Sequence, residues 1–292
     1  MHLIVGATGM LGGELCRLMV EQRRAIRALV RGSSSPEKVE RLRGLGAEVV
    51  RGDLKDRASL ETACRGASTV VSTASSTMTR QQGDSIESVD RQGQLNLIDA
   101  AEEAGVEHFI LISFPSVDID FPLQTAKRAV EDRLRRGRIM TYTILQPTCF
   151  TEVWLSPALG FDLAHATAQI YGGGHNRISW ISFRDVARFA AAAVDNPQAI
   201  NAVIKLGGPD ALSPLDVVRL AEQVLGKTVV VRHVPEEALR AQLGAATDPL
   251  QRSLAGLMLY YAGGDVIDMA DASRALPVQH LRSVREYLQA VP

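Results

Sequence analysis

Short apolar segments recur through the first half of the chain. Each is rich in valine or isoleucine and apolar on both faces, the pattern of a strand buried within a parallel sheet. The segments predicted to be strands are 2–6, 25–31, 47–51, 69–73, 108–113 and 140–146.

Helical patterns separate these strands. In one of them Leu95, Ile98 and Ala101 recur at three-residue spacing, which gives the helix a single apolar stripe. The segments predicted to be helices are 12–22, 59–64, 92–104 and 124–136. Because strands and helices alternate, residues 1–150 are predicted to form right-handed βαβ units and a doubly wound (Rossmann) parallel sheet, an α/β fold.

The pattern changes after residue 146. Segment 147–177 mixes proline, glycine, histidine and aromatic residues, which favours the wall of a pocket over another repeating unit. Ser213 is predicted to cap a helix over 215–225. We expect 151–292 to form a smaller mixed lobe around a substrate pocket. The segments expected to return to the sheet lie within 178–208, with strands at 178–182 and 201–206 and a helix at 183–194.

Charge and cysteine content narrow the possible partners. The 32 Lys and Arg residues nearly cancel the 33 Asp and Glu residues, so no basic face for nucleic acid is expected. The widely spaced cysteines Cys16, Cys64 and Cys149 suit neither a metal site nor a disulfide framework. Without a signal peptide pattern or an apolar run of roughly 18 residues, we expect a cytoplasmic protein that is not in the membrane.

The sequence GATGMLG lies between the first predicted strand and the first predicted helix. A dinucleotide pyrophosphate needs a tight turn, a close backbone approach and a helix N-terminus, and glycines at 6, 9 and 12 can meet these needs. An ordinary turn is the alternative, because a glycine triplet alone is weak evidence. The residues predicted here to bind a cofactor are Gly6, Thr8, Gly9, Met10, Leu11 and Gly12.

The end of the second predicted strand indicates which dinucleotide is bound. Sites that prefer NAD place an acidic residue there for the ribose 2′-hydroxyl, but this chain has Arg31 followed by Gly32 and three serines. Arginine pairs well with a phosphate, so NADP(H) is the predicted cofactor. The alternative is a solvated arginine at the mouth of a loop.

With these residues in place, the chain resembles the NmrA-like branch of the atypical short-chain dehydrogenase/reductase superfamily. Besides the glycine loop, the resemblance rests on the following segments: ALVR (28–31), RGDL (51–54), Val89-Asp90, NLIDAA (96–101), 110–113, Lys127, 142–148 and WISFRDVA (180–187).

The resemblance also implies roles for residues outside the glycine loop. Asp53 and Leu54 are expected beside the adenine, although Asp53 could equally cap the helix that follows it. Thr73, Ala74 and Ser75 are expected to line the cofactor, although Thr73 could simply end a strand. The residues expected near the nicotinamide are Pro147, Thr148 and Phe150.

The catalytic residues are less clear from the sequence. Typical members of the superfamily have a tyrosine four residues before the lysine, but Leu123 stands there in this chain. By resemblance to the isoflavone reductases, Lys127 is expected to act without it, orienting the nicotinamide ribose or donating a proton, with Ser113 nearby. The alternative is that Lys127 and Glu131, four residues apart, form an ordinary surface pair on a helix.

Two classes of function therefore remain open. One is an NADPH-dependent reductase of a small apolar acceptor such as a quinone or enone. The pocket lining suggested for it is Phe114, Phe150, Trp154, Leu155 and Phe161, although these residues could equally belong to the core. The other is a non-catalytic NADP(H)-binding redox sensor or regulatory protein, for which a protein partner or a homo-oligomer is possible. A role in assembling another protein also remains open.

Overall fold

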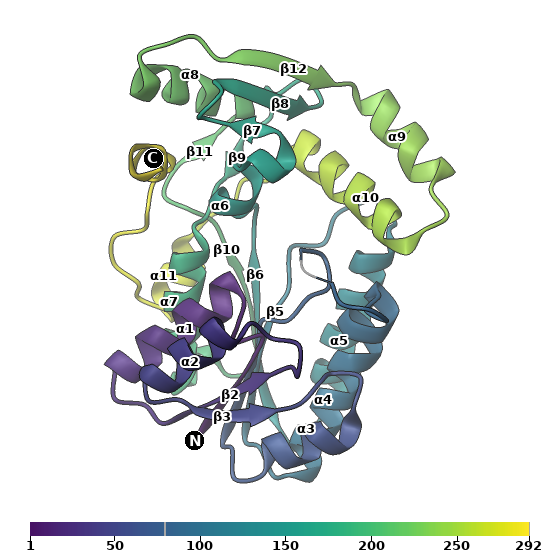
Figure 1. The fold of residues 1–292 in the computed structure, drawn as a ribbon, viewed down its shortest axis with the longest axis vertical. Helices are drawn as coiled ribbons and strands as arrows, with labels where there is room; N and C mark the ends of the chain where they lie inside the picture. The colour runs from purple at the N-terminus through teal and green to yellow at the C-terminus, as the bar shows by residue number, and fades with distance from the viewer. Residues whose placement is uncertain (79, 292) are drawn as a thin grey trace.

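The computed structural model describes residues 1–78 and 80–291. Seven parallel strands form its main sheet, in the order β10-β6-β5-β4-β1-β2-β3 (Figure 1). The strands are β1 (His2–Val5), β2 (Ile26–Val30), β3 (Glu48–Arg51), β4 (Thr69–Ser72), β5 (His108–Ile112), β6 (Thr141–Pro147) and β10 (Ala202–Leu206). This is the doubly wound Rossmann order with one added strand, and its order reverses between β1 and β4.

Helices cover both faces of the sheet (Figure 1). One face packs on α1 (Met10–Glu21), α2 (Pro36–Gly44) and α7 (Phe183–Ala193). The other packs on α3 (Arg57–Cys64), α4 (Gln92–Glu103) and α5 (Pro122–Arg136). The pattern had not predicted α2, because Leu42 is its only buried residue and one apolar position gives no stripe.

The remaining elements build a lobe above the carboxyl ends of the strands (Figure 1). Its strands are β7 (Phe161–Asp162), β8 (Thr167–Tyr171), β9 (Ile178–Ser179), β11 (Ala211–Leu212) and β12 (Val230–Val234). Its helices and turns are α6 (Thr151–Trp154), η2 (Pro157–Leu159), α8 (Pro214–Leu225), α9 (Glu236–Ala245), α10 (Pro249–Gly263) and α12 (Val284–Ala290). The short elements η1 (Ile86–Arg91), η3 (Pro197–Ala199) and α11 (Ala270–Ala275) lie against the sheet domain.

Several predictions for the second half of the chain can be compared directly with the structure. Ser213 caps α8 as predicted: its hydroxyl accepts a hydrogen bond from the amide of Asp216 at 3.1 Å. The predicted strand 178–182 is wrong beyond Ser179, because Ser182 already caps α7. Leu155 and Phe161, suggested as pocket lining, are instead buried in the lobe's own core. Among the described residues, no helix is both long enough and apolar enough to cross a membrane.

Candidate nucleotide and substrate site

Two adjoining cavities open at the carboxyl ends of the central strands. The glycine-loop cavity lies between the ends of β1, β2 and β4, where open α/β sheets bind ligands. The apolar cavity continues from it beneath the lobe and has a volume of about 300 Å³. Gly9, Thr73 and Ser75 line both cavities, so the two form one continuous site.

The glycine loop is shaped by contacts that exclude side chains. Gly6 has φ +86°, and a Cβ there would lie 2.5 Å from Thr73 Oγ1. A Cβ at Gly12 would lie 2.2 Å from the carbonyl oxygen of Gly6, and Thr73 Oγ1 donates to Val5 O at 3.0 Å. Thr73 therefore does more than end a strand: it packs against the loop. The first turn of α1 has no acidic residue, so its N–H groups and helix dipole can bind an anion.

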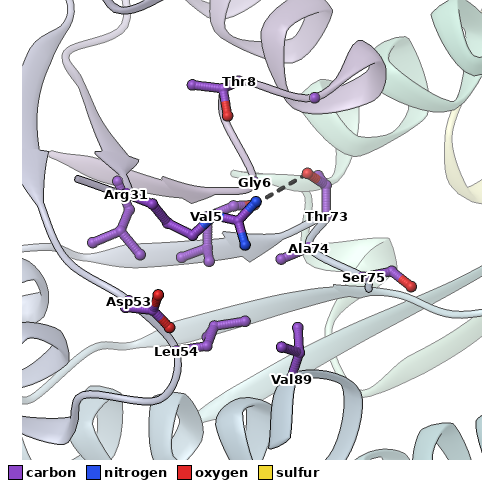
Figure 2. Close-up of a pocket in the computed structure, with 12 residues that line it drawn as sticks. Val5, Gly6, Thr8, Arg31, Asp53, Leu54, Thr73, Ala74, Ser75 and Val89 are labelled. Carbon is purple, nitrogen blue, oxygen red and sulfur yellow. Dashed lines mark hydrogen bonds between the residues drawn. The ribbon is translucent and has the colours of Figure 1, made fainter. Parts of the chain in front are cut away.

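Charged side chains gather at the far end of the glycine-loop cavity. Figure 2 shows Arg31 and Asp53 at one end of this cavity and Thr73 and Ser75 at the other. Arg31 Nη1 lies 2.7 Å from Asp84 Oδ2, and Lys55 Nζ lies 2.6 Å from Asp84 Oδ1. Arg31 is thus ion-paired rather than merely solvated. Sequence reasoning missed both Lys55 and Asp84, and only the adjacency of Lys55 to Leu54 could have pointed to either.

Asp53 lines this cavity but does not cap the helix that follows it. The cap of α3 is Asp56, whose carboxylate accepts from the amide of Ser59 at 3.4 Å. Asp53 Oδ1 accepts instead from the amide of Lys55 at 2.9 Å. The helix-capping alternative for Asp53 is therefore wrong.

Apolar side chains from several parts of the chain line the second cavity. Met10 and Leu11 come from α1, Phe150 and Trp154 from the segment after β6, and Leu123 from α5. Leu123 leaves no hydroxyl at the position where typical relatives have tyrosine. One wall was not predicted at all, because it comes from α10, far along the sequence: Leu254, Leu257, Met258 and Tyr260.

Lys127 lines the apolar cavity, and its side chain is buried. Its Nζ donates to Ile112 O at 3.3 Å and lies 3.9 Å from Asp90 Oδ1. Asp90 is fully buried; its Oδ2 accepts from the amide and hydroxyl of Ser76, whereas Oδ1 has no hydrogen-bond partner among the described residues. Burial lowers the pKa of Lys127 below its ordinary value, while Asp90 opposes that shift. A lysine held in this way can release a proton more readily than one in water.

The surface-pair alternative for Lys127 is wrong. Glu131 is fully buried, and its carboxylate accepts from Gln146 Nε2 and pairs with Arg128 and Arg135, each at 2.9 Å. Arg128 Nη2 also donates to Ser113 Oγ at 3.0 Å. Ser113 is therefore oriented by Arg128 and keeps its own hydroxyl hydrogen available for a ligand.

Every residue predicted to bind the cofactor or to act in catalysis lines one or both cavities. The glycine-loop cavity includes Gly6, Thr8, Gly9, Arg31, Asp53, Leu54, Thr73, Ala74 and Ser75. The apolar cavity includes Met10, Leu11, Gly12, Ser113, Lys127, Pro147, Thr148 and Phe150. The hydroxyl of Thr148 donates its hydrogen to Ser179 O, so it can only accept a hydrogen bond from a ligand. Their roles toward a cofactor remain predictions.

The sheet, the glycine loop and the cavity at the strand-order reversal define a Rossmann nucleotide-binding protein. The chain belongs to the NmrA-like family, whose family model matches residues 2–288. It is 28% identical to a phenylcoumaran benzylic ether reductase from Pinus taeda over 98% of this chain and 96% of that protein. It is 30% identical to an NAD(P)H azoreductase from Xenophilus azovorans over 84% of this chain and 81% of that protein. It is 27% identical to a photosystem II assembly factor from Trieres chinensis over 80% of this chain and 72% of that protein.

Solved structures share the fold. An NADPH-dependent quinone oxidoreductase from Escherichia coli, complexed with NADPH, matches with a TM-score of 0.76 and 23% identity, over 99% of this chain and 98% of that one. A triphenylmethane reductase from Citrobacter sp., complexed with NADP(H), matches with a TM-score of 0.77 and 22% identity, over 99% of both chains. Both structures contain the cofactor predicted here from Arg31.

Proposed function

We propose that this protein is an NADPH-dependent reductase of a small apolar acceptor such as a quinone or enone. The observation that carries the proposal is the position of Lys127, a buried ammonium that lines an apolar cavity continuous with a glycine-loop nucleotide site. Reductases of several small molecules among the relatives support the same reaction class.

The residues present suit an NADP(H) molecule along the whole site. Gly6 and Gly12 have no side chain to block the close approach of a pyrophosphate to the backbone, and the N-terminus of α1 offers N–H groups that can bind it. Arg31 and Lys55 supply cations for a 2′-phosphate. NADPH, when bound, supplies the hydride for reduction.

The protein's own part in the chemistry is then to bind the acceptor and to supply or stabilise a proton. Apolar walls from α1, α6 and α10 exclude water from the acceptor and favour an aromatic or other apolar molecule. Reduction of a carbonyl or quinone leaves an oxyanion that needs a proton or a positive charge. Lys127 can provide either, because burial lowers its pKa and Ile112 O accepts only one of its hydrogens.

A second candidate is a non-catalytic NADP(H) sensor that regulates or helps to assemble another protein. Leu123 in place of the usual tyrosine favours it, as does the likeness to a photosystem II assembly factor. A sensor must bind NADPH and NADP⁺ with different affinities, since a ligand shifts an equilibrium only by its differential binding.

One set of experiments separates these candidates. NADPH oxidation is followed by nicotinamide absorbance against quinones, enones and azo dyes, while calorimetry measures the dissociation constants of NADPH and NADP⁺. The reductase predicts turnover of at least one acceptor class. Absence of turnover together with tight and unequal binding of the two redox forms would favour the sensor instead.

A further inference from the structure

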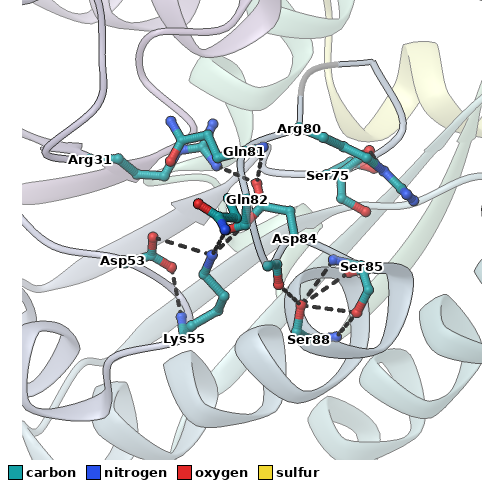
Figure 3. Close-up of polar contacts among 12 residues, drawn as sticks. Arg31, Asp53, Lys55, Ser75, Arg80, Gln81, Gln82, Asp84, Ser85 and Ser88 are labelled. Carbon is teal, nitrogen blue, oxygen red and sulfur yellow. Dashed lines mark hydrogen bonds and ion pairs between the residues drawn. The ribbon is translucent and has the colours of Figure 1, made fainter.

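Asp84 is ion-paired to Arg31, the residue predicted to bind the 2′-phosphate, although it lies 53 residues after Arg31 in the chain. Its side chain is only 1% exposed, whereas those of Arg31 and Lys55 are 30% and 28% exposed. The carboxylate bridges the two cations, with Oδ2 on Arg31 and Oδ1 on Lys55, and so connects the loops that follow β2 and β3 (Figure 3).

The local backbone holds this carboxylate in place. The amide of Asp84 donates to Gln81 O at 3.0 Å, and the amide of Gln81 donates back to Asp84 Oδ2 at 2.9 Å. The next residue, Ser85, caps η1 with its side chain. Asp84 is therefore presented by a hydrogen-bonded turn at the start of a helix, unlike a chance pair between two flexible surface chains.

The charges at this end of the cavity balance without a ligand. Arg31 and Lys55 contribute two positive charges, and Asp84 and Asp53 contribute two negative ones, with Lys55 Nζ 3.9 Å from Asp53 Oδ2. Burial raises the pKa of Asp84, but hydrogen bonds from Lys55, Gln81 and Arg31 outweigh that and lower it overall, so the carboxylate is ionised at neutral pH. A 2′-phosphate, with a charge near −2, must compete with Asp84 for the same donors.

We propose that Asp84 is a specificity-determining residue that competes with the cofactor 2′-phosphate for Arg31 and Lys55. It weakens the preference for NADPH over NADH that the two cations would otherwise give. NADH has a ribose 2′-hydroxyl in place of this phosphate, so no anion of the ligand competes with Asp84 for Arg31 and Lys55, and its binding should not depend on Asp84. This inference rests on the proposed binding of NADP(H), but not on the proposed reaction.

The test uses nucleotides that lack the nicotinamide, so that it stays independent of turnover. Calorimetry at fixed low salt measures binding of 2′,5′-ADP and of 5′-AMP, the adenosine halves of NADPH and NADH, to the wild type and to Asp84→Asn. Asparagine retains an oxygen for the Gln81 amide but removes the charge. Binding of 2′,5′-ADP should tighten on the order of tenfold, as expected when a like charge and a competing charged hydrogen bond are removed. Binding of 5′-AMP should change less than about twofold.

Two further variants keep the result specific. Glu87→Gln removes the same charge three residues away, from a side chain that pairs with Arg91, and should change neither affinity. In an Arg31→Ala background, Asp84→Asn should have a smaller effect on 2′,5′-ADP binding, because only Lys55 of the two contested donors is left. Thermal unfolding establishes that each variant is folded.

The failures are distinguishable. A folded Asp84→Asn protein that binds 2′,5′-ADP no more tightly than the wild type would overturn this inference and make Asp84 a residue that merely orients Arg31. A wild type that binds neither 2′,5′-ADP nor NADPH would overturn the proposed cofactor, and this inference with it.

Discussion

The substitution Gly12→Ala should damage the nucleotide loop, whereas Gly13→Ala, one residue further along the same helix, should stabilise the protein. An added Cβ at Gly12 would lie 2.2 Å from Gly6 O and 2.7 Å from Gly6 C, both backbone atoms. At Gly13 the nearest such atom, Ala7 O, is 3.4 Å away, an ordinary contact. The two changes are chemically identical and differ only in what the new methyl group meets.

The magnitudes follow from that difference. Alanine is favoured over glycine inside a helix by about 1 kcal/mol, so Gly13→Ala should raise the free energy of unfolding by up to that amount. At Gly12 this gain is opposed by overpacking, which costs roughly 1–3 kcal/mol, so stability should fall by up to about 2 kcal/mol. Relief of the clash must also move the loop at Gly6. We therefore expect the NADPH dissociation constant of Gly12→Ala to rise at least about tenfold, or ~1.4 kcal/mol.

Urea unfolding measures the stability of both variants, and NADPH fluorescence titration measures their affinity. Gly13→Ala should bind NADPH like the wild type. If Gly12→Ala did so as well, the reasoning that the loop backbone must approach the pyrophosphate closely would be refuted.

Three other predictions concern the two ends of the site and the pH dependence of folding. Arg31→Ala should weaken NADPH binding by roughly 10- to 100-fold, because a charged hydrogen-bonding group is lost, and should change the affinity for NADH much less; calorimetry measures both affinities. Leu257→Trp should narrow the apolar cavity and raise the KM for the acceptor several-fold in steady-state kinetics, leaving NADPH affinity unchanged. Burial lowers the pKa of His108 from 6.5 to about 4. Between pH 6.5 and about pH 4, the imidazole is therefore protonated in the unfolded chain but neutral in the folded protein. His108 stabilisation is therefore complete above pH 6.5, and up to about 3 kcal/mol should be lost between pH 6.5 and 4 in urea unfolding, a slope that His108→Gln should reduce.

Local patterns predicted the sheet domain well, because its signals are local. Each strand of the first half lies within a residue or two of its predicted segment, since short runs rich in valine and isoleucine favour strands. The glycine loop was equally predictable, because Gly6 and Gly12 are required by contacts within a few residues and with one strand end. The NmrA-like family match agrees with the resemblance inferred from the same motifs.

The rest of the site depends on contacts that are distant in sequence. Asp84 reaches Arg31 only because β2 and the segment after β4 meet at the sheet edge, and no local pattern marks that pairing. The wall from α10 likewise comes from over a hundred residues beyond Lys127. The sequence could not decide between pocket and core for Leu155 and Phe161 for a related reason: an apolar residue in a loop-like segment fits a core as well as a pocket, and both residues lie in the core.

Comparison of Lys127→Met with the wild type tests the central claim most directly. Lys227→Met, at an exposed lysine after α8, is the matched control. With NADPH and the best acceptor from the panel, we predict that kcat falls by about 10²- to 10⁴-fold in Lys127→Met, the usual contribution of one acid–base group, while the NADPH dissociation constant changes only a few-fold. The control should keep wild-type kcat. Full turnover by a folded Lys127→Met protein would contradict the account.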